Sequence, residues 1–251
     1  MTYAATQYLD RAGQPRLAYR QHLGRAPTIL FLPGYASDMA GGKASAVFDW
    51  ALANDHGCIL FDYAGCGQSA GDFADQTLES WLDDAMDIIA ALAGDAKILP
   101  IGSSMGGWLM LLLARAMPER VAALVGIAAA PDFTRWGFDA DEKSVLARDG
   151  RLLQPNPYGD EPTLTTLDFW QSGERHLLLD APIALNMPLT LLHGMADADV
   201  PWENALRLVN AFGSARVRLH LVKDGDHRLS RDTDIALLLR EITAICTEIS
   251  C

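Results

Sequence analysis

The chain has 251 residues, half of them hydrophobic and 21% charged, and its formal net charge is −12 at pH 7. This length and composition indicate one globular domain with a sizeable core and exclude a disordered chain. The acidic balance excludes a nucleic-acid-binding protein, because such proteins neutralise phosphates with clustered Lys and Arg.

The cysteines and the N-terminus bear on the cellular compartment. Cys58, Cys66, Cys246 and Cys251 form neither a CxxC pair nor a metal-binding spacing, so we expect a reducing compartment. Cys58 falls in an apolar run and is expected to be buried, whereas Cys66 lies in a glycine turn and is expected to be more exposed. No apolar signal region opens the chain, and no stretch reaches the roughly 18 apolar residues of a membrane span. The sequence therefore predicts a cytoplasmic protein without stable membrane insertion.

Short apolar runs recur along the chain and predict strands. Residues 5–9 and 16–21 indicate an antiparallel hairpin at one edge of a sheet. Six further runs are continuously apolar rather than alternating, which is typical of parallel strands buried on both faces. These runs are 28–32, 58–61, 97–101, 121–127, 189–192 and 217–222.

Helical patterns separate these runs. Residues 77–93 place their apolar side chains on one face, with Thr77 as the expected N-cap. Similar apolar faces occur in residues 105–116, 203–211 and 233–248. Because strands and helices alternate, we expect an α/β fold with a mostly parallel, doubly wound sheet.

The segment 133–187 breaks this alternation. It carries several charges, two prolines and a helical fragment at 141–147. We therefore expect a core formed by 1–132 and 188–251, with 133–187 inserted as a small cap over the carboxyl ends of the strands. Five aromatic residues of this cap either line an apolar pocket or form the cap's own core: Phe133, Trp136, Phe138, Phe169 and Trp170.

The stretch IGSSMGGW contains two adjacent serines directly after a predicted strand. A serine nucleophile in a strand-to-helix turn needs small residues two positions before and two after it, because larger side chains collide there. Ser104 meets this requirement with Gly102 and Gly106, whereas Ser103 has isoleucine and methionine at those positions. Ser104 is therefore the predicted nucleophile.

A serine nucleophile needs a base, and His227 is the predicted one. It lies in the polar loop KDGDHR after the last strand, at the sheet edge where the serine turn also lies. The other histidines are assigned structural positions: His22 and His56 on the surface, His176 in the cap, His220 packed in a strand, and His193 at a strand end, where it fixes a loop.

The acid that orients the base is expected on the loop after the preceding strand, in the chain order Ser, Asp, His. The sequence HGMADADVPW offers Asp197 and Asp199 there, and spacing alone does not separate them. A reaction oxyanion needs N–H donors. We expect these donors to be the backbone of Met105, at a helix N-terminus, and of Tyr35, in the loop after an early strand.

No cofactor or metal is predicted. The chain has no HExxH sequence and no Cys/His cluster. The turn GCGQSAG lacks both the last glycine of GxGxxG and a nearby basic residue. The chemistry is therefore expected to depend on side chains and backbone alone.

Five sequence blocks together carry a family resemblance: LPGY, FDYAGCGQSAG, GSSMGGW, LLHGMADADVPW and DGDHR. They resemble the α/β-hydrolase superfamily, and in particular its branch of mitochondrial palmitoyl-protein thioesterases and acyl-glucuronide esterases. The resemblance runs from residue 15 to the C-terminus and is least sharp in the cap. Since the chain lacks a transit peptide, it is similar to a bacterial, cytoplasmic relative of that branch.

The resemblance implies the α/β-hydrolase fold and a Ser-Asp-His triad. It implies Ser104 as nucleophile and His227 as base. It also implies Asp197 as the acid, because the family pattern H-G-x-x-D-x-x-V-P places the acid at that residue. The backbone N–H groups of Tyr35 and Met105 match the family's oxyanion positions.

The main hypothesis is a serine hydrolase that cleaves carboxylic esters or thioesters through an acyl-enzyme. Two alternatives stay open: an acyltransferase that uses the same triad, and a hydrolase-fold ligand-binding protein in which turnover is incidental. The expected partner is a small-molecule ester or thioester. The sequence specifies no oligomeric state.

Overall fold

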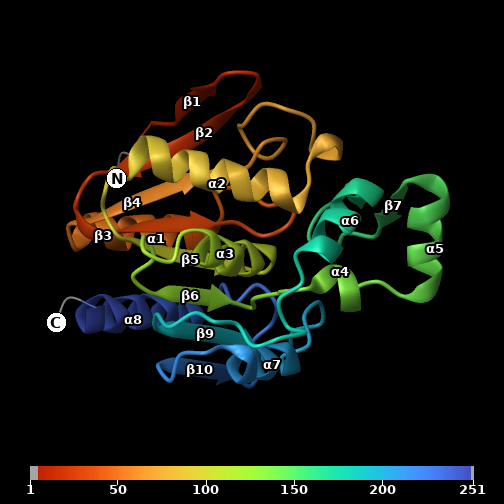
Figure 1. Cartoon of the computed structure of the whole chain (residues 1–251). Coiled ribbons are helices and arrows are strands. Elements are labelled where there is room, and N and C mark those ends of the chain that lie inside the picture. Colours follow the sequence, from red (N-terminus) through yellow and green to blue (C-terminus); the bar gives the residue numbers. More distant parts are fainter. Residues whose placement is uncertain (1–4, 250–251) are drawn as a thin grey trace.

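The computed structural model describes residues 5–249, which fold around one eight-stranded sheet (Figure 1). The strands are β1 (Gln7–Arg11), β2 (Gln14–His22), β3 (Arg25–Leu32), β4 (His56–Phe61), β5 (Ile98–Ser103), β6 (Leu124–Ile127), β9 (Leu189–Gly194) and β10 (Val217–Val222). Their spatial order is β1-β2-β4-β3-β5-β6-β9-β10. β2 runs antiparallel to β1 and β4, whereas the other neighbouring pairs are parallel. The predicted mostly parallel sheet with an edge hairpin is therefore confirmed.

Helices cover both faces of the sheet (Figure 1). One face carries α1 (Gly42–Ala53) and α8 (Asp232–Ile249), and the other carries α2 (Leu78–Leu92), α3 (Met105–Ala116) and α7 (Glu203–Ala211). A short 3₁₀ turn, η1 (Phe73–Asp75), precedes α2. The Thr77 hydroxyl accepts a hydrogen bond from the Ser80 N–H at 3.0 Å, so Thr77 is the N-cap of α2 as predicted. Helix α1 is the one element of these layers that the sequence did not predict.

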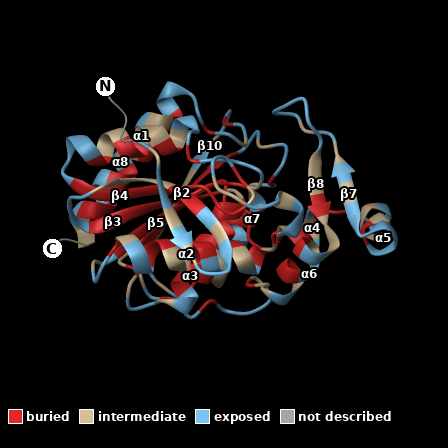
Figure 2. Cartoon of the chain, turned by 90° about the horizontal axis from the view of Figure 1, so that it is seen from above, coloured by how far each residue is buried: buried red, intermediate tan, exposed pale blue. Residues whose placement is uncertain are grey.

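The strands lie buried between the two helix layers, as Figure 2 shows for β3, β4 and β5. Successive side chains of a strand point to opposite faces, so one continuous apolar run serves two cores. In β3, Leu30 and Leu32 pack with residues of α2 and α3. Ile29 and Phe31 of the same strand pack with residues of α1 and α8. This two-sided burial explains why the strands read as unbroken apolar runs in the sequence.

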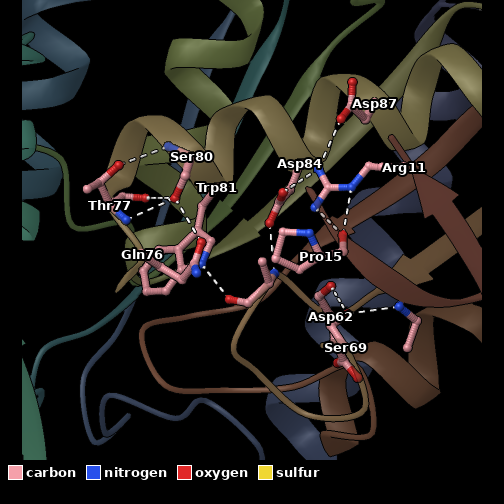
Figure 3. A network of polar contacts seen from close by, with 12 residues as sticks. Arg11, Pro15, Asp62, Ser69, Gln76, Thr77, Ser80, Trp81, Asp84 and Asp87 are labelled. Atoms are coloured by element: carbon pink, nitrogen blue, oxygen red, sulfur yellow. Dashed lines mark hydrogen bonds and ion pairs between the residues drawn. The ribbon is translucent and has the colours of Figure 1, made fainter. Parts of the chain in front are cut away.

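A buried ion pair fastens the edge hairpin to α2 (Figure 3). Arg11 Nη1 lies 2.7 Å from Asp84 Oδ1 and 2.9 Å from Asp87 Oδ2, and Arg11 Nε donates to the carbonyl oxygen of Pro15 at 2.9 Å. Asp84 also accepts a hydrogen bond from the Ala64 N–H. Burial raises the pKa of Asp84, and the contacts with Ala64 and Arg11 oppose that rise. The network ties β1, α2 and the loop after β4 into one unit.

The segment between β6 and β9 forms elements of its own beside the sheet (Figure 1). They are α4 (Phe133–Trp136), α5 (Ala140–Asp149), β7 (Arg151–Gln154), β8 (Thr163–Thr166) and α6 (Leu167–Arg175). β7 and β8 pair antiparallel, a hairpin that is not among the predicted elements. Residues 155–162, which join these two strands, are called the hairpin tip below.

Buried aromatic residues of 133–187 form core rather than the lining of a pocket. The ring of Phe169 lies 4.8 Å from that of Tyr35 and 5.5 Å from that of Trp81. Phe133 packs on Trp108 of α3, with ring centroids 5.7 Å apart. Phe133 and Phe169 therefore pack as core, although not as the separate core of the cap that the second alternative described. This core is continuous with that of α2 and α3 and is not separate.

The cysteines are mostly buried. Cys58 is buried as predicted, but Cys66 is also buried, which corrects the expectation of a more exposed thiol. The glycine turn that contains Cys66 folds back onto η1, where a Cβ on Gly65 would lie 2.7 Å from the backbone of Phe73. Burial raises the pKa of the Cys66 thiol to about 12. Cys251 lies outside the described residues.

None of the helices within residues 5–249 combines the length and the apolar character needed to cross a bilayer.

Candidate active site

Ser104 stands at the sharp turn between β5 and α3. Its backbone has φ +54° and ψ −119°, a conformation that residues other than glycine rarely adopt. The Ser104 N–H donates to the carbonyl oxygen of Ile127 at 2.9 Å. The Ser104 carbonyl oxygen accepts hydrogen bonds from the N–H groups of Gly107 and Ala130, at 2.9 and 3.0 Å. These bonds to the end of β6 and to α3 hold the strained turn at the carboxyl edge of the sheet.

The two glycines that flank Ser104 are sterically required. A Cβ added at Gly102 would lie 2.2 Å from the carbonyl oxygen of Gly106. A Cβ added at Gly106 would lie 2.0 Å from the carbonyl oxygen of Leu32. Both clashes involve backbone atoms, which cannot rotate away. The spacing rule that selects Ser104 over Ser103 therefore has a direct steric cause in this structure.

His227 lies between Ser104 and Asp197. Its Nε2 is 3.1 Å from Ser104 Oγ, and its Nδ1 is 2.9 Å from Asp197 Oδ2. An ionised carboxylate only accepts hydrogen bonds, so Nδ1 carries the hydrogen and Nε2 is left to accept the serine proton. The three side chains come from the loops that follow β5, β9 and β10, which end at the same edge of the sheet.

The environment of Asp197 keeps it ionised. Its side chain has no exposed surface, and burial alone would raise its pKa. The imidazoles of His193 and His227 and the N–H of Val200 outweigh burial and hold the pKa of Asp197 well below its usual value. Asp197 Oδ1 accepts hydrogen bonds from the N–H groups of Asp199 and Val200, at 2.9 and 2.8 Å. The imidazole of His227 thus faces a fixed negative charge.

Asp199, the other acidic residue of this loop, is placed differently. It is exposed, and its carboxylate accepts a hydrogen bond from the Tyr158 hydroxyl of the hairpin tip. The ligand atoms of Asp197, Asp199 and His227 lie within 4.8 Å of one another, close enough to share a cation. Both oxygens of Asp197 and both nitrogens of His227 already have protein partners, however. The arrangement therefore suits proton transfer better than metal ligation.

Two glycines bring the acid loop and the base loop together. A Cβ on Gly194, the last residue of β9, would lie 2.2 Å from the carbonyl oxygen of Gly225. The Ala196 N–H donates to that same oxygen at 2.9 Å. Gly225 precedes His227 by two residues. This close crossing therefore sets the distance between the loop of Asp197 and the loop of His227. The sequence reasoning missed this contact, although a glycine stands at the start of each loop and signals it.

Met105 and Tyr35, the predicted oxyanion donors, both lie near Ser104. Met105 is the first residue of α3, so its N–H has no acceptor within the helix. Tyr35 follows Gly34, where a Cβ would lie only 3.4 Å from Ser104 Cβ. Within residues 5–249 neither N–H donates a hydrogen bond, so both are available to a substrate oxygen.

A cavity of about 800 Å³ opens at Ser104 and His227. Its lining includes the hairpin tip, the loop after β3 and the start of α1. The sequence reasoning missed two of its lining residues, Tyr158 and Lys43. Lys43 Nζ donates to the carbonyl oxygen of Arg228, and burial, aided by the nearby guanidinium, lowers the pKa of Lys43 to about 8.

The other histidines correct some of the predicted positions. His56 is buried and stacks on a tryptophan of α1, so it is not a surface residue. His220 lies in β10 as predicted but is only partly packed, since 30% of its side chain is exposed, and its Nε2 lies 3.1 Å from Glu241. His193 fixes its loop as predicted, since its Nε2 lies 3.0 Å from the carbonyl oxygen of Val200.

Comparisons with known proteins define the class. Residues 27–155 match the family described as alpha/beta hydrolase fold. The chain belongs to the α/β-hydrolase family, which confirms both the predicted fold class and the resemblance.

Two curated relatives match nearly the whole chain. The human protein named "Palmitoyl-protein thioesterase ABHD10, mitochondrial" is 39% identical over 247 residues, which cover 97% of this chain and 80% of the relative. Its mouse counterpart is 38% identical over 251 residues, which cover 98% of this chain and 84% of the relative.

Two solved structures are similar along nearly their whole length. Alpha/beta hydrolase domain-containing protein 10 from mouse has a TM-score of 0.91 at 36% identity, covering 98% of this chain and 100% of that one. A putative hydrolase from Agrobacterium vitis S4 has a TM-score of 0.90 at 35% identity, covering 96% and 98%.

These relatives confirm one prediction and overturn another. The predicted enzyme class, a serine esterase or thioesterase of the α/β-hydrolase type, is confirmed. The predicted cytoplasmic location is wrong, because the curated relatives that match nearly the whole chain are mitochondrial proteins. The physical reason is that targeting signals are separate from the folded domain, so the residues of the hydrolase fold carry no address.

Proposed function

We propose that the protein hydrolyses carboxylic esters or thioesters through an acyl-enzyme on Ser104. The observation that carries this proposal is the continuous contact from Ser104 Oγ through the His227 ring to Asp197 Oδ2, at 3.1 and 2.9 Å. Contacts of this length suit a nucleophile, a general base and the acid that orients the base.

In the acylation step, Ser104 Oγ attacks the acyl carbonyl carbon and its proton passes to His227 Nε2. Asp197 stabilises the imidazolium that forms. The carbonyl oxygen becomes an oxyanion and accepts hydrogen bonds from the N–H groups of Met105 and Tyr35, each worth roughly 3 kcal/mol in comparable sites. The bond to the leaving alcohol or thiol then breaks, and the leaving group takes the proton from His227.

In the deacylation step, water gives a proton to His227 and attacks the acyl-enzyme. The second oxyanion collapses, the acid is released, and Ser104 recovers its proton. The curated relatives are named palmitoyl-protein thioesterases, which supports acyl thioesters as a substrate class here. Because the hairpin tip walls the cavity, we propose that 133–187 acts as a cap that limits which acyl and leaving groups enter.

A panel of p-nitrophenyl esters and acyl thioesters of increasing chain length tests this function. We expect turnover by the wild type and a loss of about 10⁴-fold or more in Ser104→Ala and His227→Ala. A steep preference for long chains supports the thioesterase-like activity, whereas turnover of acetate alone counts against it. If Ser104→Ala hydrolyses the panel as fast as the wild type, the proposed nucleophile is wrong.

Adding a competing nucleophile separates hydrolysis from acyl transfer. With hydrolysis, an added alcohol or thiol leaves the carboxylic acid as the main product. A main product that carries the acyl group on the acceptor indicates a transferase instead.

A further inference from the structure

The carboxylate of Asp197 has a second imidazole beside it. His193, the fifth residue of β9, is buried with a relative exposure of 1%. Its Nε2 lies 3.0 Å from the carbonyl oxygen of Val200 and 3.3 Å from Asp197 Oδ2. Oδ2 is also the atom that faces His227 Nδ1, so one oxygen lies between two imidazole rings.

The contact with Val200 fixes the tautomer of His193. A carbonyl oxygen only accepts hydrogen bonds, so Nε2 of His193 must carry the hydrogen. That hydrogen therefore points into the space shared by the Val200 carbonyl and the Asp197 carboxylate. The ring presents a donor to the carboxylate without needing a positive charge.

These contacts close the turn that carries the acid. Residue Val200 is tied to Asp197 Oδ1 through its N–H and to His193 through its carbonyl oxygen. Asp199 adds a second N–H on Oδ1. The carboxylate is thus held on Oδ1 by two backbone donors, and His193 is the side chain that joins the far end of the turn to strand β9. Any rotation of the carboxylate would separate Oδ2 from His193 as well as from His227.

We propose that His193 is a positioning residue. Its Nε2–H holds the Val200 carbonyl and the Asp197 carboxylate in one geometry, so that Oδ2 faces Nδ1 of His227. This inference rests on the proposed function, because it assigns His193 an effect through the acid of the triad. His193 is not among the residues that line the cavity. We therefore expect its substitution to lower kcat and to leave KM nearly unchanged.

The pair His193→Gln and His193→Met tests this role. The two new side chains have similar length and volume, but only glutamine carries an N–H donor near the position of Nε2. We expect His193→Met to lower kcat by about 10- to 100-fold with KM within about twofold, since small misplacement of a catalytic group costs factors of this size. His193→Gln should recover a large part of that loss. Titration of active sites with a fluorophosphonate gives the concentration of folded enzyme and so corrects the kcat of each variant.

Two outcomes overturn the inference. The first is a wild-type kcat in His193→Met. The second is an equal loss of kcat in both variants together with an equal loss of melting temperature, because His193 would then only stabilise the fold. Ser104→Ala in the same assay distinguishes a failure of the proposed function from a failure of the role of His193. If Ser104→Ala stays active, the proposed function fails. If Ser104→Ala is inactive while His193→Met is fully active, only the role of His193 fails.

A measurement on the wild-type protein does not depend on the folding of any variant. Long-range ¹H–¹⁵N correlation of histidine-labelled protein reports which ring nitrogen carries the hydrogen. We expect the Nε2–H tautomer for His193 at neutral pH. The Nδ1–H tautomer would contradict the proposed contact directly.

Discussion

The sheet edge that carries Ser104 and the segment 133–187 beside it are held in different ways. At the sheet edge, backbone atoms fix the geometry: three backbone hydrogen bonds hold Ser104, and the loops of acid and base cross at two glycines. In 133–187, side chains make many of the connections to the rest of the molecule. The Tyr35 hydroxyl donates to the carbonyl oxygen of Leu164 at 2.7 Å, and the Tyr158 hydroxyl donates to Asp199.

The difference teaches where this enzyme tolerates change. A backbone contact cannot be removed without moving the chain, so the positions of the proposed catalytic residues are rigidly specified. A tyrosine hydroxyl can be removed alone, and the free energy at risk is that of one hydrogen bond. Segment 133–187 can therefore vary, and with it the cavity wall, while the sheet edge stays the same.

Among substitutions outside Ser104, Asp197 and His227, the largest expected effect comes from Gly106→Ala. The added Cβ would lie 2.0 Å from the carbonyl oxygen of Leu32, so the serine turn and β3 must separate. We expect kcat/KM for an ester to fall by about 10³-fold or more, because displacement of a nucleophile by an ångström already costs about 10²-fold. Gly42→Ala is the control for melting temperature, since its Cβ meets nothing within 4 Å. Wild-type kcat/KM in Gly106→Ala would contradict the steric account of the turn.

The lowered pKa of Lys43 predicts how the free energy of unfolding changes with pH. Burial and Arg228 lower the pKa of Lys43 from 10.5 to about 8 in the folded state, so between these values the unfolded chain binds more protons. Stability must then rise with pH across this window, by roughly 1–2 kcal/mol for this half-buried group. Urea unfolding of the wild type and Lys43→Met at several pH values measures it. We expect the unfolding free energy of the wild type, relative to that of the variant, to increase from pH 8 to pH 10.5. Parallel curves of unfolding free energy against pH would refute the lowered pKa.

Tyr35→Phe removes one link between the two regions. The variant keeps the backbone N–H proposed as an oxyanion donor but leaves the carbonyl oxygen of Leu164 without the hydroxyl. We expect a loss of about 1 kcal/mol in unfolding free energy and kcat within about threefold of the wild type. Urea unfolding and ester kinetics measure the two quantities. A collapse of kcat without loss of stability would show that the hydroxyl itself takes part in the reaction.

Tyr158→Phe should have the smallest effect on stability. Tyr158 is exposed, so loss of its bond to Asp199 should change the unfolding free energy by less than about 0.5 kcal/mol. Because the lost hydroxyl joins Tyr158 to Asp199, and both residues line the cavity, we expect a change of a few fold in KM that depends on the leaving group. Tyr8→Phe, also at an exposed tyrosine, is the matched control. Identical KM values in both variants across the ester panel would exclude a role for the bond between Tyr158 and Asp199 in selecting substrates.

The two regions also differ in how well the sequence predicts them. The turn around Ser104 is local: Gly102 and Gly106 stand two residues away, so spacing identifies the serine without other information. The strands are equally legible, because burial on both faces leaves unbroken apolar runs. Helix α1 escaped prediction although Val47, Phe48 and Ala51 recur at helical spacing, since the segment begins with glycines, which are poor helix formers.

Contacts between distant residues that no motif marks could not be predicted. The bond between Tyr158 and Asp199 joins residues 41 apart, and no periodicity in the sequence reports it. Spacing alone likewise does not choose Asp197 over Asp199. The family pattern indicates Asp197, and in the structure it is the Asp197 carboxylate that faces His227 Nδ1. The burial of His56 follows from packing under α1, the helix that was missed.

The most direct test of the central claim is to identify the residue that a fluorophosphonate labels. Peptide mass spectrometry of the labelled wild-type protein should find a single adduct, on Ser104. The adduct should be absent from Ser104→Ala and should form far more slowly in His227→Ala. An adduct on Ser103 or on another residue, or undiminished labelling of Ser104→Ala, would contradict the account.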